Sequence, residues 1–211
     1  MGQAITFAQQ KGGAGKTTVL AHLAAGWSRG GRRVALIDLD PQRSLTRWAA
    51  LRADPALTLI DSRDYRAGGD IKAAKREVDL VLVDCPGAAS GLLDSAVRES
   101  DVVLAPCQPS VMDVWALDSI VATAAQLKRP LRILLNRVPA RLGSLDEVLA
   151  ALGPHQALVL DSRLGNRNGF SRSMLNGRTA DEIAPRAAAA AETAALRAEL
   201  DALLDALPDT R

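Results

Sequence analysis

The stretch FAQQKGGAGKTT, residues 7 to 18, combines the residue types that hold the phosphates of a nucleotide. Its GKT at positions 15 to 17 matches the end of the phosphate-binding pattern GxxxxGK[ST], in which backbone N–H groups and the lysine bind phosphate oxygens and the hydroxyl binds Mg²⁺. Gln10 stands where that pattern has its first glycine, and a second lysine, Lys11, follows directly. A loop that holds one nucleotide needs one such lysine, so Lys11 requires a role of its own.

The loop is predicted to follow a strand and to open a helix at Thr17, so that backbone N–H groups and the helix N-terminus point at one anion. Lys16 is predicted to bridge the β- and γ-phosphates of the nucleotide, and Thr17 to offer its hydroxyl to Mg²⁺. Thr18, in the first helical turn, is placed to donate a hydrogen bond to the α-phosphate. The residues predicted to bind the nucleotide here are Gly12, Gly13, Ala14, Gly15, Lys16, Thr17 and Thr18.

Carboxylates follow two of the predicted strands. Asp38 and Asp40 lie in LIDLDPQ, after the second apolar run, and Asp84 belongs to LVLVDCPG. Mg²⁺ prefers oxygen ligands in octahedral geometry and keeps several waters, so carboxylates beside the loop are the ligands to expect. Each of them alone could be a polar residue that ends a strand. Together with the loop they predict a site for Mg²⁺ and a nucleotide.

The elements that position these residues alternate between strand and helix. Segments of helical character separate most of seven short apolar runs, at residues 4 to 9, 33 to 38, 57 to 61, 79 to 84, 102 to 106, 131 to 136 and 157 to 161. Near-continuous apolar strands joined by helices indicate a mostly parallel sheet with helices on both faces, because parallel strands need crossover connections. The predicted fold is a doubly wound α/β sheet of the P-loop NTPase type, with its ligand at the carboxyl ends of the strands.

Glycine, proline and alanine mark the boundaries of several elements. Gly30 and Gly31 are predicted to close the first helix, and residues 67 to 70 to form a turn. The alanine run at 187 to 191 follows Pro185 and is predicted to open a terminal helix that packs on the sheet or at a partner surface.

Composition favours a single cytosolic domain spanning residues 1 to 211. The chain is 48% hydrophobic and 24% charged, which suits one globular unit with a sizeable core. It has no basic and apolar leader and no apolar run near 18 residues, so neither secretion nor membrane spanning is expected. The two cysteines, Cys85 and Cys107, lack CxxC spacing and are predicted to be free thiols at buried strand ends.

The loop and the strands around it resemble those of the deviant Walker A ATPases of the ParA and MinD group. That group's loop pattern, KGGxxGK[ST], is matched by Lys11, Gly12, Gly13, Gly15, Lys16 and Thr17. LIDLDPQ is similar to the group's second motif, LVLVDCPG to its Walker B strand, and NGRTADEI at 176 to 183 to a segment of the short ParA-type partition proteins. No helix-turn-helix domain precedes the loop, so a site-specific repressor is not expected.

The resemblance implies that ATP joins two copies of the chain face to face. A lysine on the outer wall of the loop is badly placed to reach its own γ-phosphate but can reach the nucleotide held by a twofold-related partner. Lys11 would then act as an arginine finger does, neutralising charge on the transferred phosphoryl group. ATP would hold the dimer together, and hydrolysis would release it.

Further roles follow from the chemistry and the resemblance together. Asp40 is predicted to orient the attacking water, whereas Asp38 and Asp84 hold Mg²⁺ through its waters. The predicted catalytic residues are Lys11, Lys16 and Asp40, and the predicted Mg²⁺ ligands are Thr17, Asp38 and Asp84. Asn136, at the end of the sixth strand, is similar to an asparagine that the family uses on the adenine edge; an asparagine that merely finishes a strand is the alternative. His22, inside the first helix, is predicted to be structural.

Positive charge is concentrated in the second half of the chain. Between residues 128 and 178 there are nine basic and three acidic residues, a local balance of +6, although the whole chain carries only +2. Such a surface can neutralise DNA phosphates without reading bases, and the scarcity of aromatic residues disfavours base stacking. The segment 161 to 173 is predicted to be an exposed loop with Arg163, Arg167 and Arg172 as DNA contacts. A solvated charged face is the alternative.

The resemblance implies a positioning switch in the cytoplasm, associated with the nucleoid. Its partners would be a second copy of the chain, non-specific double-stranded DNA, and an adaptor on the cargo that stimulates slow ATP hydrolysis. The cargo would be a plasmid, a chromosome region or a protein cluster.

Three other functions are weighed against this one. A MinD-like membrane ATPase is disfavoured because the terminal segment ALRAELDALLDALPDTR is acidic and lacks aromatic residues. An iron–sulfur carrier of the nitrogenase-reductase type would use two cysteines per chain, but the surroundings of Cys85 and Cys107 do not match that family. A metabolic ligase of the same ATPase class would need an acceptor pocket, for which the sequence has no motif.

Overall fold

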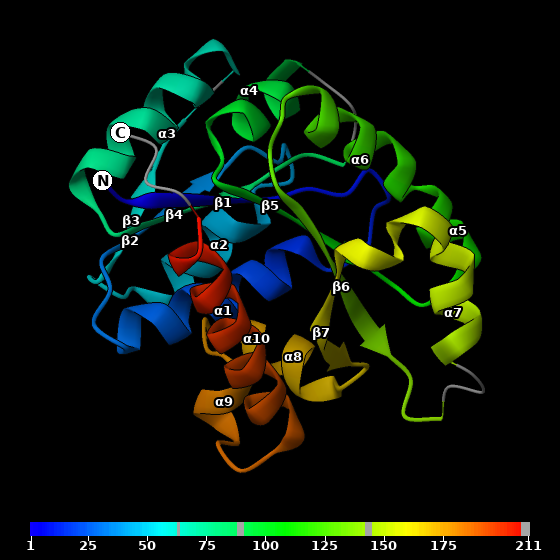
Figure 1. Cartoon of the computed structure of the whole chain (residues 1–211). Helices are drawn as coiled ribbons and strands as arrows, with labels where there is room; N and C mark the ends of the chain where they lie inside the picture. Colours follow the sequence, from blue (N-terminus) through cyan, green and yellow to red (C-terminus); the bar gives the residue numbers. More distant parts are fainter. Residues whose placement is uncertain (63, 88–90, 142–144, 208–211) are drawn as a thin grey trace.

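The computed structural model describes residues 1–62, 64–87, 91–141 and 145–207, and these form a seven-stranded sheet. The strands are β1 Gln3–Phe7, β2 Val34–Asp38, β3 Leu57–Ile60, β4 Leu80–Asp84, β5 Val102–Cys107, β6 Leu131–Val138 and β7 Val159–Gly165. Neighbouring strands are parallel throughout, in the order β3-β2-β4-β1-β5-β6-β7 (Figure 1). The predicted doubly wound parallel sheet is confirmed, and each strand overlaps one of the apolar runs.

Helices connect the strands and cover both faces of the sheet (Figure 1). They are α1 Lys16–Arg29, α2 Ser44–Arg52, α3 Ala67–Glu77, α4 Gly91–Glu99, α5 Val111–Trp115, α6 Leu117–Gln126, α7 Leu145–Leu152, α8 Asn168–Met174, α9 Ala180–Ile183 and α10 Ala188–Asp205, with 3₁₀ turns at Asp64–Arg66 and Gly153–Leu158. Side chains from α1, α2, α8 and α10 form the core on one face, and side chains from α3 to α7 form the core on the other.

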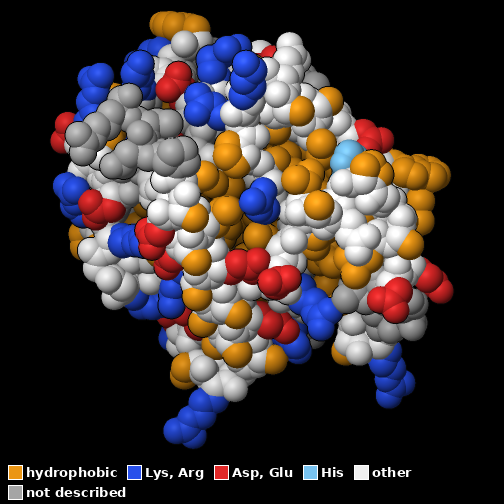
Figure 2. Space-filling view, viewed as in Figure 1, with side chains coloured by type: hydrophobic (Ala, Val, Ile, Leu, Met, Phe, Trp, Pro, Cys, Tyr) orange, Lys and Arg blue, Asp and Glu red, His pale blue; other side chains and the backbone are white. Residues whose placement is uncertain are grey.

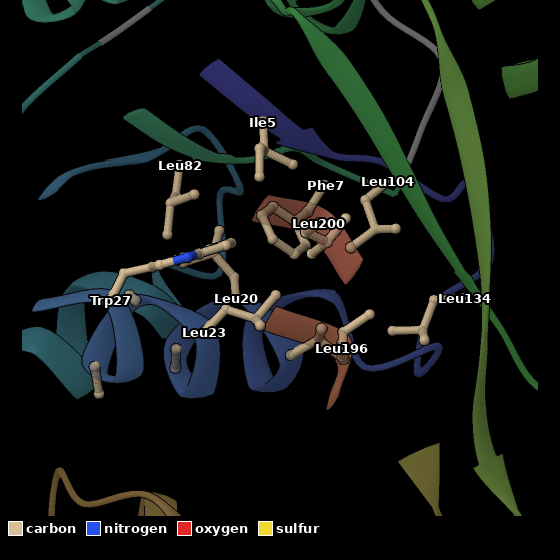
Figure 3. Close-up of a cluster of buried hydrophobic side chains, with 14 of the residues drawn as sticks. Ile5, Phe7, Leu20, Leu23, Trp27, Leu82, Leu104, Leu134, Leu196 and Leu200 are labelled. Atoms are coloured by element: carbon tan, nitrogen blue, oxygen red, sulfur yellow. The ribbon is translucent and has the colours of Figure 1, made fainter. Parts of the chain in front are cut away.

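Alternate side chains of the central strands point to opposite faces, so each face has its own core. On β1, Ile5 and Phe7 point into the core shared with α1 and α10, whereas Ala4 points into the core shared with α3, α4 and α6. Figure 3 shows the first core, in which Leu20 of α1 and Leu200 of α10 lie near the β1 side chains. Because both faces are covered, the central strands read in sequence as near-continuous apolar runs.

The phosphate-binding motif lies between β1 and α1, in the middle of the sheet. β1 stands between β4 and β5, so the chain turns to one side of β1 for β2 and to the other for β5, and ligands of open α/β sheets bind at such a point. α1 begins at Lys16, one residue before the predicted start, and ends at Arg29, with Gly30 as its C-cap. Gly31 then adopts a left-handed φ of 88°. The prediction that these two glycines close the helix is confirmed.

The turn predicted at residues 67 to 70 is wrong, because these residues form the first turn of α3. Two glycines in this stretch disfavour a helix, but Ala67, Ile71 and Ala74 recur at helical spacing and are buried in the core. Burial of this apolar face outweighs the low helix propensity of glycine, which costs about 1 kcal/mol per residue relative to alanine.

The segment 161 to 173 is not a loop, as predicted, but comprises the end of β7 and most of α8. β7 is an edge strand, and along it only Leu160 and Leu164 are fully buried, so its sequence is largely polar. On the free edge, three backbone N–H groups donate to the carboxylates of Glu192 and Glu199 from α10. These side chains replace the missing neighbour strand, which is a long-range effect that the local sequence does not reveal.

α10 is the terminal helix predicted after Pro185, and it packs on the sheet. Leu196, Leu200 and Leu204 are buried in the core next to α1. Residues 208–211 of the terminal segment lie outside the described residues. Within the described ranges, no helix combines the length and the apolar character needed to cross a membrane.

Candidate nucleotide-binding site

The loop between β1 and α1 depends on glycine at two positions. Gly13 and Gly15 have left-handed φ values of 83° and 92°, which residues with a side chain rarely adopt. A Cβ atom on Gly15 would also lie only 2.5 Å from Nδ2 of Asn136. The loop therefore has the backbone conformations of an anion-binding concavity, and it leads directly into the N-terminus of a helix.

Lys16 and Thr17 lie in the first turn of α1 and face the predicted carboxylates. The Lys16 side chain is buried, and its ammonium donates to the backbone carbonyl of Gln9 at 3.3 Å, so it lies against the loop. Thr17 Oγ1 donates to Asp84 Oδ2 at 2.5 Å, which ties α1 to the carboxyl end of β4. The structure thus brings together the lysine, the hydroxyl and the carboxylate that the sequence analysis assigned to one site.

Asp84 fits the predicted Mg²⁺ site. Its side chain is fully buried, and among the described residues Oδ1 has no hydrogen-bond partner. Burial raises the pKa of Asp84 to about 7, although the hydrogen bond from Thr17 and the charge of Lys16 oppose this shift. A buried oxygen without a partner, next to a threonine hydroxyl, provides the oxygen donors that Mg²⁺ and its waters require. Thr17 and Asp84 would hold the ion, whose charge would favour the ionised carboxylate.

Asp38 and Asp40 are linked, and Asp38 positions the loop that carries Asp40. Oδ2 of Asp38 accepts from both the N–H and the hydroxyl of Thr46 at 2.8 Å, and Oδ1 accepts from the N–H of Asp40 at 3.2 Å. Asp38 therefore fixes the start of α2, and a contact with Mg²⁺ stays a prediction. Asp40 is partly exposed, accepts from the N–H of Gln42, and lines the cleft beside the loop.

Two adjoining clefts surround the phosphate loop. The larger, of about 670 Å³, is lined by the loop, by Asp40 and by Pro86. The smaller, of about 200 Å³, has Leu164 and Phe170 in its wall. Both clefts are lined by Gly15, Thr18, Arg137 and Ser171. A cleft that contains the phosphate loop, Lys16 and Asp40, next to a smaller one, suits a triphosphate and the base attached to it.

Asn136 lines the smaller cleft, but both ends of its amide are engaged. Nδ2 donates to the carbonyl of Ala14 at 2.7 Å, and Oδ1 accepts from the N–H of Arg137 at 2.9 Å. In this structure Asn136 braces the phosphate loop. A contact between Asn136 and the adenine edge stays a prediction. It would require one of these two hydrogen bonds to break so that the amide could bind the base instead.

Lys11 projects away from both clefts, in contrast to Lys16. It lines neither cleft, and 39% of its side chain is exposed. Its ammonium donates to Oδ2 of Asp113, at the start of α5, at 2.5 Å. Asp113 is buried and also accepts a hydrogen bond from the hydroxyl of Ser110. The second lysine is therefore held at the outer rim of the loop by a buried carboxylate.

The three arginines predicted to contact DNA differ in their surroundings. Arg163 on β7 and Arg172 on α8 are exposed, and neither forms an ion pair within the described part of the chain. Arg167 is exposed too, but its guanidinium contacts Glu192 at 2.5 and 3.0 Å, so its charge is offset. Figure 2 shows a further group of basic side chains at the top of the view, near α3 and α4, which the charge count did not single out.

Sequence reasoning missed three residues around the loop. Arg137 and Ser171 line both clefts, and Asp113 binds Lys11. Arg137 also has a left-handed φ of 54°, which is uncommon for a residue with a side chain. Arg137 lies at the carboxyl end of β6, and Asp113 lies in the helix that follows β5, and this closeness to strand ends was the signal available in the sequence.

The residues interpreted as structural are confirmed as such. His22 is buried; its Nε2 accepts from the N–H of Ala180 at 3.0 Å, and burial lowers its pKa, so the ring is neutral. Cys85 and Cys107 are buried free thiols, and burial raises the pKa of both, that of Cys107 to about 12. Neither sulfur reaches the surface, where an iron–sulfur cluster shared by two copies would need it.

Comparison with known proteins places these features in a family. Residues 5–180 match the family described as CbiA, the CobQ/CobB/MinD/ParA nucleotide binding domain. The maintenance of carboxysome distribution protein A of Halothiobacillus neapolitanus is 29% identical over 203 residues, covering 89% of this chain and 91% of that protein. The chromosome-partitioning ATPase Soj of Thermus thermophilus is 31% identical over 205 residues, covering 83% of this chain and 70% of Soj.

A solved structure agrees with the fold. The complex of an McdA variant from Cyanothece with ATP matches with a TM-score of 0.78 and 17% identity, covering 95% of this chain and 96% of that one. At this level of identity the likeness concerns the fold alone.

Proposed function

Because the chain belongs to the CobQ/CobB/MinD/ParA family of nucleotide-binding domains, we propose that it is an ATP-driven positioning switch. ATP and Mg²⁺ join two copies, the dimer binds DNA without sequence preference, and hydrolysis separates the copies and releases the DNA. The observation that carries the proposal is the separate placement of two loop lysines, with Lys16 buried in the loop and Lys11 turned away from both clefts.

Lys11 provides the link between assembly and hydrolysis. Held by Asp113 outside the clefts, it contributes nothing to the charge around a nucleotide bound by its own chain. In a twofold dimer its ammonium moves from Asp113 to the γ-phosphate held by the partner, where it neutralises charge in the transition state. A single copy therefore hydrolyses ATP slowly.

Asp40 is the residue proposed to position the attacking water. It lines the same cleft as Lys16 and Thr17, and its loop is held by Asp38. Thr17 and Asp84 would hold Mg²⁺, which would supply positive charge to the phosphates during hydrolysis.

The DNA-binding surface is proposed to contain Arg163 and Arg172, with Arg167 joining only if it leaves Glu192. A few arginines on one copy bind duplex DNA weakly, because non-specific affinity grows with the number of phosphates neutralised. Dimerisation doubles that number on a single rigid particle, which couples the nucleotide state to DNA affinity.

The cargo is proposed to be a large assembly carried over the nucleoid within the cytoplasm, attached through an adaptor that stimulates hydrolysis. Relatives are named for carboxysome distribution and for chromosome partitioning, which are two cases of distributing one large object. The sequence and the site fit either class of cargo equally.

Sedimentation with random-sequence duplex DNA, under ATP, ADP or no nucleotide and across a salt series, tests the DNA half of the proposal. Retention is expected with ATP and Mg²⁺ only, and it should fall steeply as salt rises. Changing Arg163 and Arg172 together to alanine should weaken the retention of the protein on DNA. It should also lower the slope of DNA affinity against salt concentration by the amount expected for the loss of about two phosphate contacts per copy. Arg76→Ala, an exposed arginine on α3, is the matched control. Retention on DNA that does not depend on the nucleotide, or a loss of retention seen only with Arg76→Ala, would contradict this assignment.

A further inference from the structure

α5 exposes large apolar side chains next to the phosphate loop. Val111, Met112 and Trp115 are 49%, 62% and 63% exposed, and together they form what we call the α5 patch. In Figure 2 hydrophobic side chains project from the edge of the molecule beside α5. Single exposed apolar residues are normal, whereas three within one short helix mark a surface that contacts another molecule.

The segment that carries the α5 patch is hydrogen-bonded to the phosphate loop at three points. The contacts are Gln108 Nε2 to the carbonyl of Gly13 at 3.2 Å, Lys11 Nζ to Asp113 Oδ2 at 2.5 Å, and Gln10 Nε2 to the hydroxyl of Ser119. These bonds couple the position of α5 to that of the phosphate loop.

We infer that the α5 patch is part of the contact between two copies of this chain in the ATP state. The inference rests on the proposed function, since it requires Lys11 to reach the partner's nucleotide. The Lys11 ammonium lies on Asp113, and Asp113 is flanked in α5 by Met112 and followed by Trp115 two residues later. A second copy close enough to receive Lys11 must therefore come against α5, and its approach covers the patch.

Charge around the α5 patch favours a protein over DNA or an anionic membrane. The one ionisable residue within α5 is Asp113, which is buried and paired with Lys11, and the next along the chain is the exposed Asp118 at the start of α6. α5 thus has no basic residue of its own to bind phosphates, and an interfacial membrane helix needs basic residues beside its apolar ones. In a twofold contact the same apolar residues of both copies are buried at one interface, which is the usual composition of an interface centre.

Tryptophan fluorescence tests the inference, because Trp115 differs from the other two tryptophans. Trp27 and Trp48 are each 2% exposed, so quenching by acrylamide reports mainly on Trp115. With Mg²⁺ and the non-hydrolysable ATP analogue AMPPNP, quenching should fall close to the level measured for Trp115→Phe, which lacks the exposed ring. With ADP it should remain at the level of the nucleotide-free protein.

Sedimentation on the same samples separates the inference from the function on which it rests. If the protein dimerises but Trp115 is quenched as strongly as in the monomer, the α5 patch is not part of the contact. The proposed switch would not be contradicted by that result. Failure to dimerise with bound AMPPNP overturns both.

A pair of substitutions gives an independent test. Met112→Gln should weaken the AMPPNP-dependent dimer by about 30-fold or more, as truncation of a central interface residue does, without changing nucleotide affinity at concentrations where the chain is monomeric. Leu51→Gln, at a similarly exposed leucine (60%) near the end of α2, should leave the dimer unchanged. Equal dimer affinities for Met112→Gln and the wild type would overturn the inference.

Discussion

At the scale of single residues, Gly15 shows how strongly the phosphate loop constrains its own sequence. Its left-handed backbone and the position of the Asn136 amide 2.5 Å from where a Cβ would lie exclude any larger residue. Gly12, in the same loop, has no atom within 4 Å of a hypothetical Cβ. The structure therefore requires glycine at Gly15 but not at Gly12, although the sequence pattern treats the two alike.

Gly15→Ala is expected to weaken ATP binding, because alanine costs about 1 to 2 kcal/mol in the left-handed region and would also push Asn136 off the loop. Titration with a fluorescent ATP analogue would measure a loss of roughly 10-fold or more. Gly12→Ala is the matched control and should bind the analogue within a few-fold of the wild type. The same affinity for both variants would show that Gly15 is not restricted in this way.

Lys16→Ala is expected to weaken binding of ATP by about 100-fold, because it removes a charge-assisted contact worth about 1.5 to 3 kcal/mol from a buried position. The control is Lys11→Ala, which removes a lysine that lines neither cleft and should leave ATP affinity of the single chain unchanged. Calorimetric titration of ATP into both variants checks the pair. Wild-type affinity in Lys16→Ala would refute its role on the phosphates.

Spacing along the chain predicted those site residues that lie within one continuous motif or at a strand end. Lys16, Thr17 and Asp84 meet where the sequence placed them. The contacts of Asn136 with Ala14, and of Lys11 with Asp113, join residues more than 100 positions apart. Such pairings depend on how strands are ordered in the sheet, which local spacing does not encode.

At the scale of elements, α2 is fixed at both ends and thereby links the loop that carries Asp40 to α9. Asp38 accepts hydrogen bonds from Thr46 in its first turn, and Arg52 in its last turn contacts Glu182 at 2.9 and 3.0 Å. Arg29 of α1 donates to the same carboxylate at 2.8 Å. α1, α2 and α9 are therefore held together by one glutamate.

Glu182→Gln is expected to destabilise the protein by about 1 to 2 kcal/mol near pH 7, after allowance for partial exposure of the carboxylate. Partial burial would raise the pKa of Glu182, but hydrogen bonds from Arg52 and Thr179 lower it to about 2. The folded-state pKa is thus below the unfolded one, so this stabilisation is present above about pH 4.5 and is lost as the pH falls towards 2.

Thermal unfolding at several pH values, with Glu77→Gln as a control at an exposed glutamate of α3, measures this effect. The difference in melting temperature between the wild type and Glu182→Gln should be largest at neutral pH and should shrink below pH 4. A difference that stays constant from pH 7 to pH 3 would count against this role of Glu182.

Element boundaries were predictable where burial and local propensity agree, and failed where they conflict. The glycines of α3 suggested a turn, but its buried face maintains a helix. The polar residues of β7 suggested a loop, but glutamates of α10 complete the hydrogen bonds of that edge strand. Both errors arise because a distant part of the chain supplies the stabilising contact.

At the scale of the whole molecule, the order of the strands separates the two lysines of the loop. The central position of β1 places Lys16 in the larger cleft, and α5, after the neighbouring strand β5, holds Lys11 at the outer rim. The parallel, doubly wound sheet was predictable from the alternation of strands and helices, whereas the order of the strands was not. The different roles of the two lysines were expected from the resemblance, but the contact of Lys11 with Asp113 was not, because it joins residues more than 100 positions apart.

The most direct test of the account is sedimentation velocity of the wild type and of Lys11→Ala with Mg²⁺ and either ATP or ADP, with phosphate release followed in parallel. The account predicts that the wild type is a dimer with ATP and a monomer with ADP, and that Lys11→Ala binds ATP but stays monomeric and releases little phosphate. A wild type that remains monomeric while saturated with ATP, or a Lys11→Ala variant that dimerises and hydrolyses ATP at the wild-type rate, would contradict it.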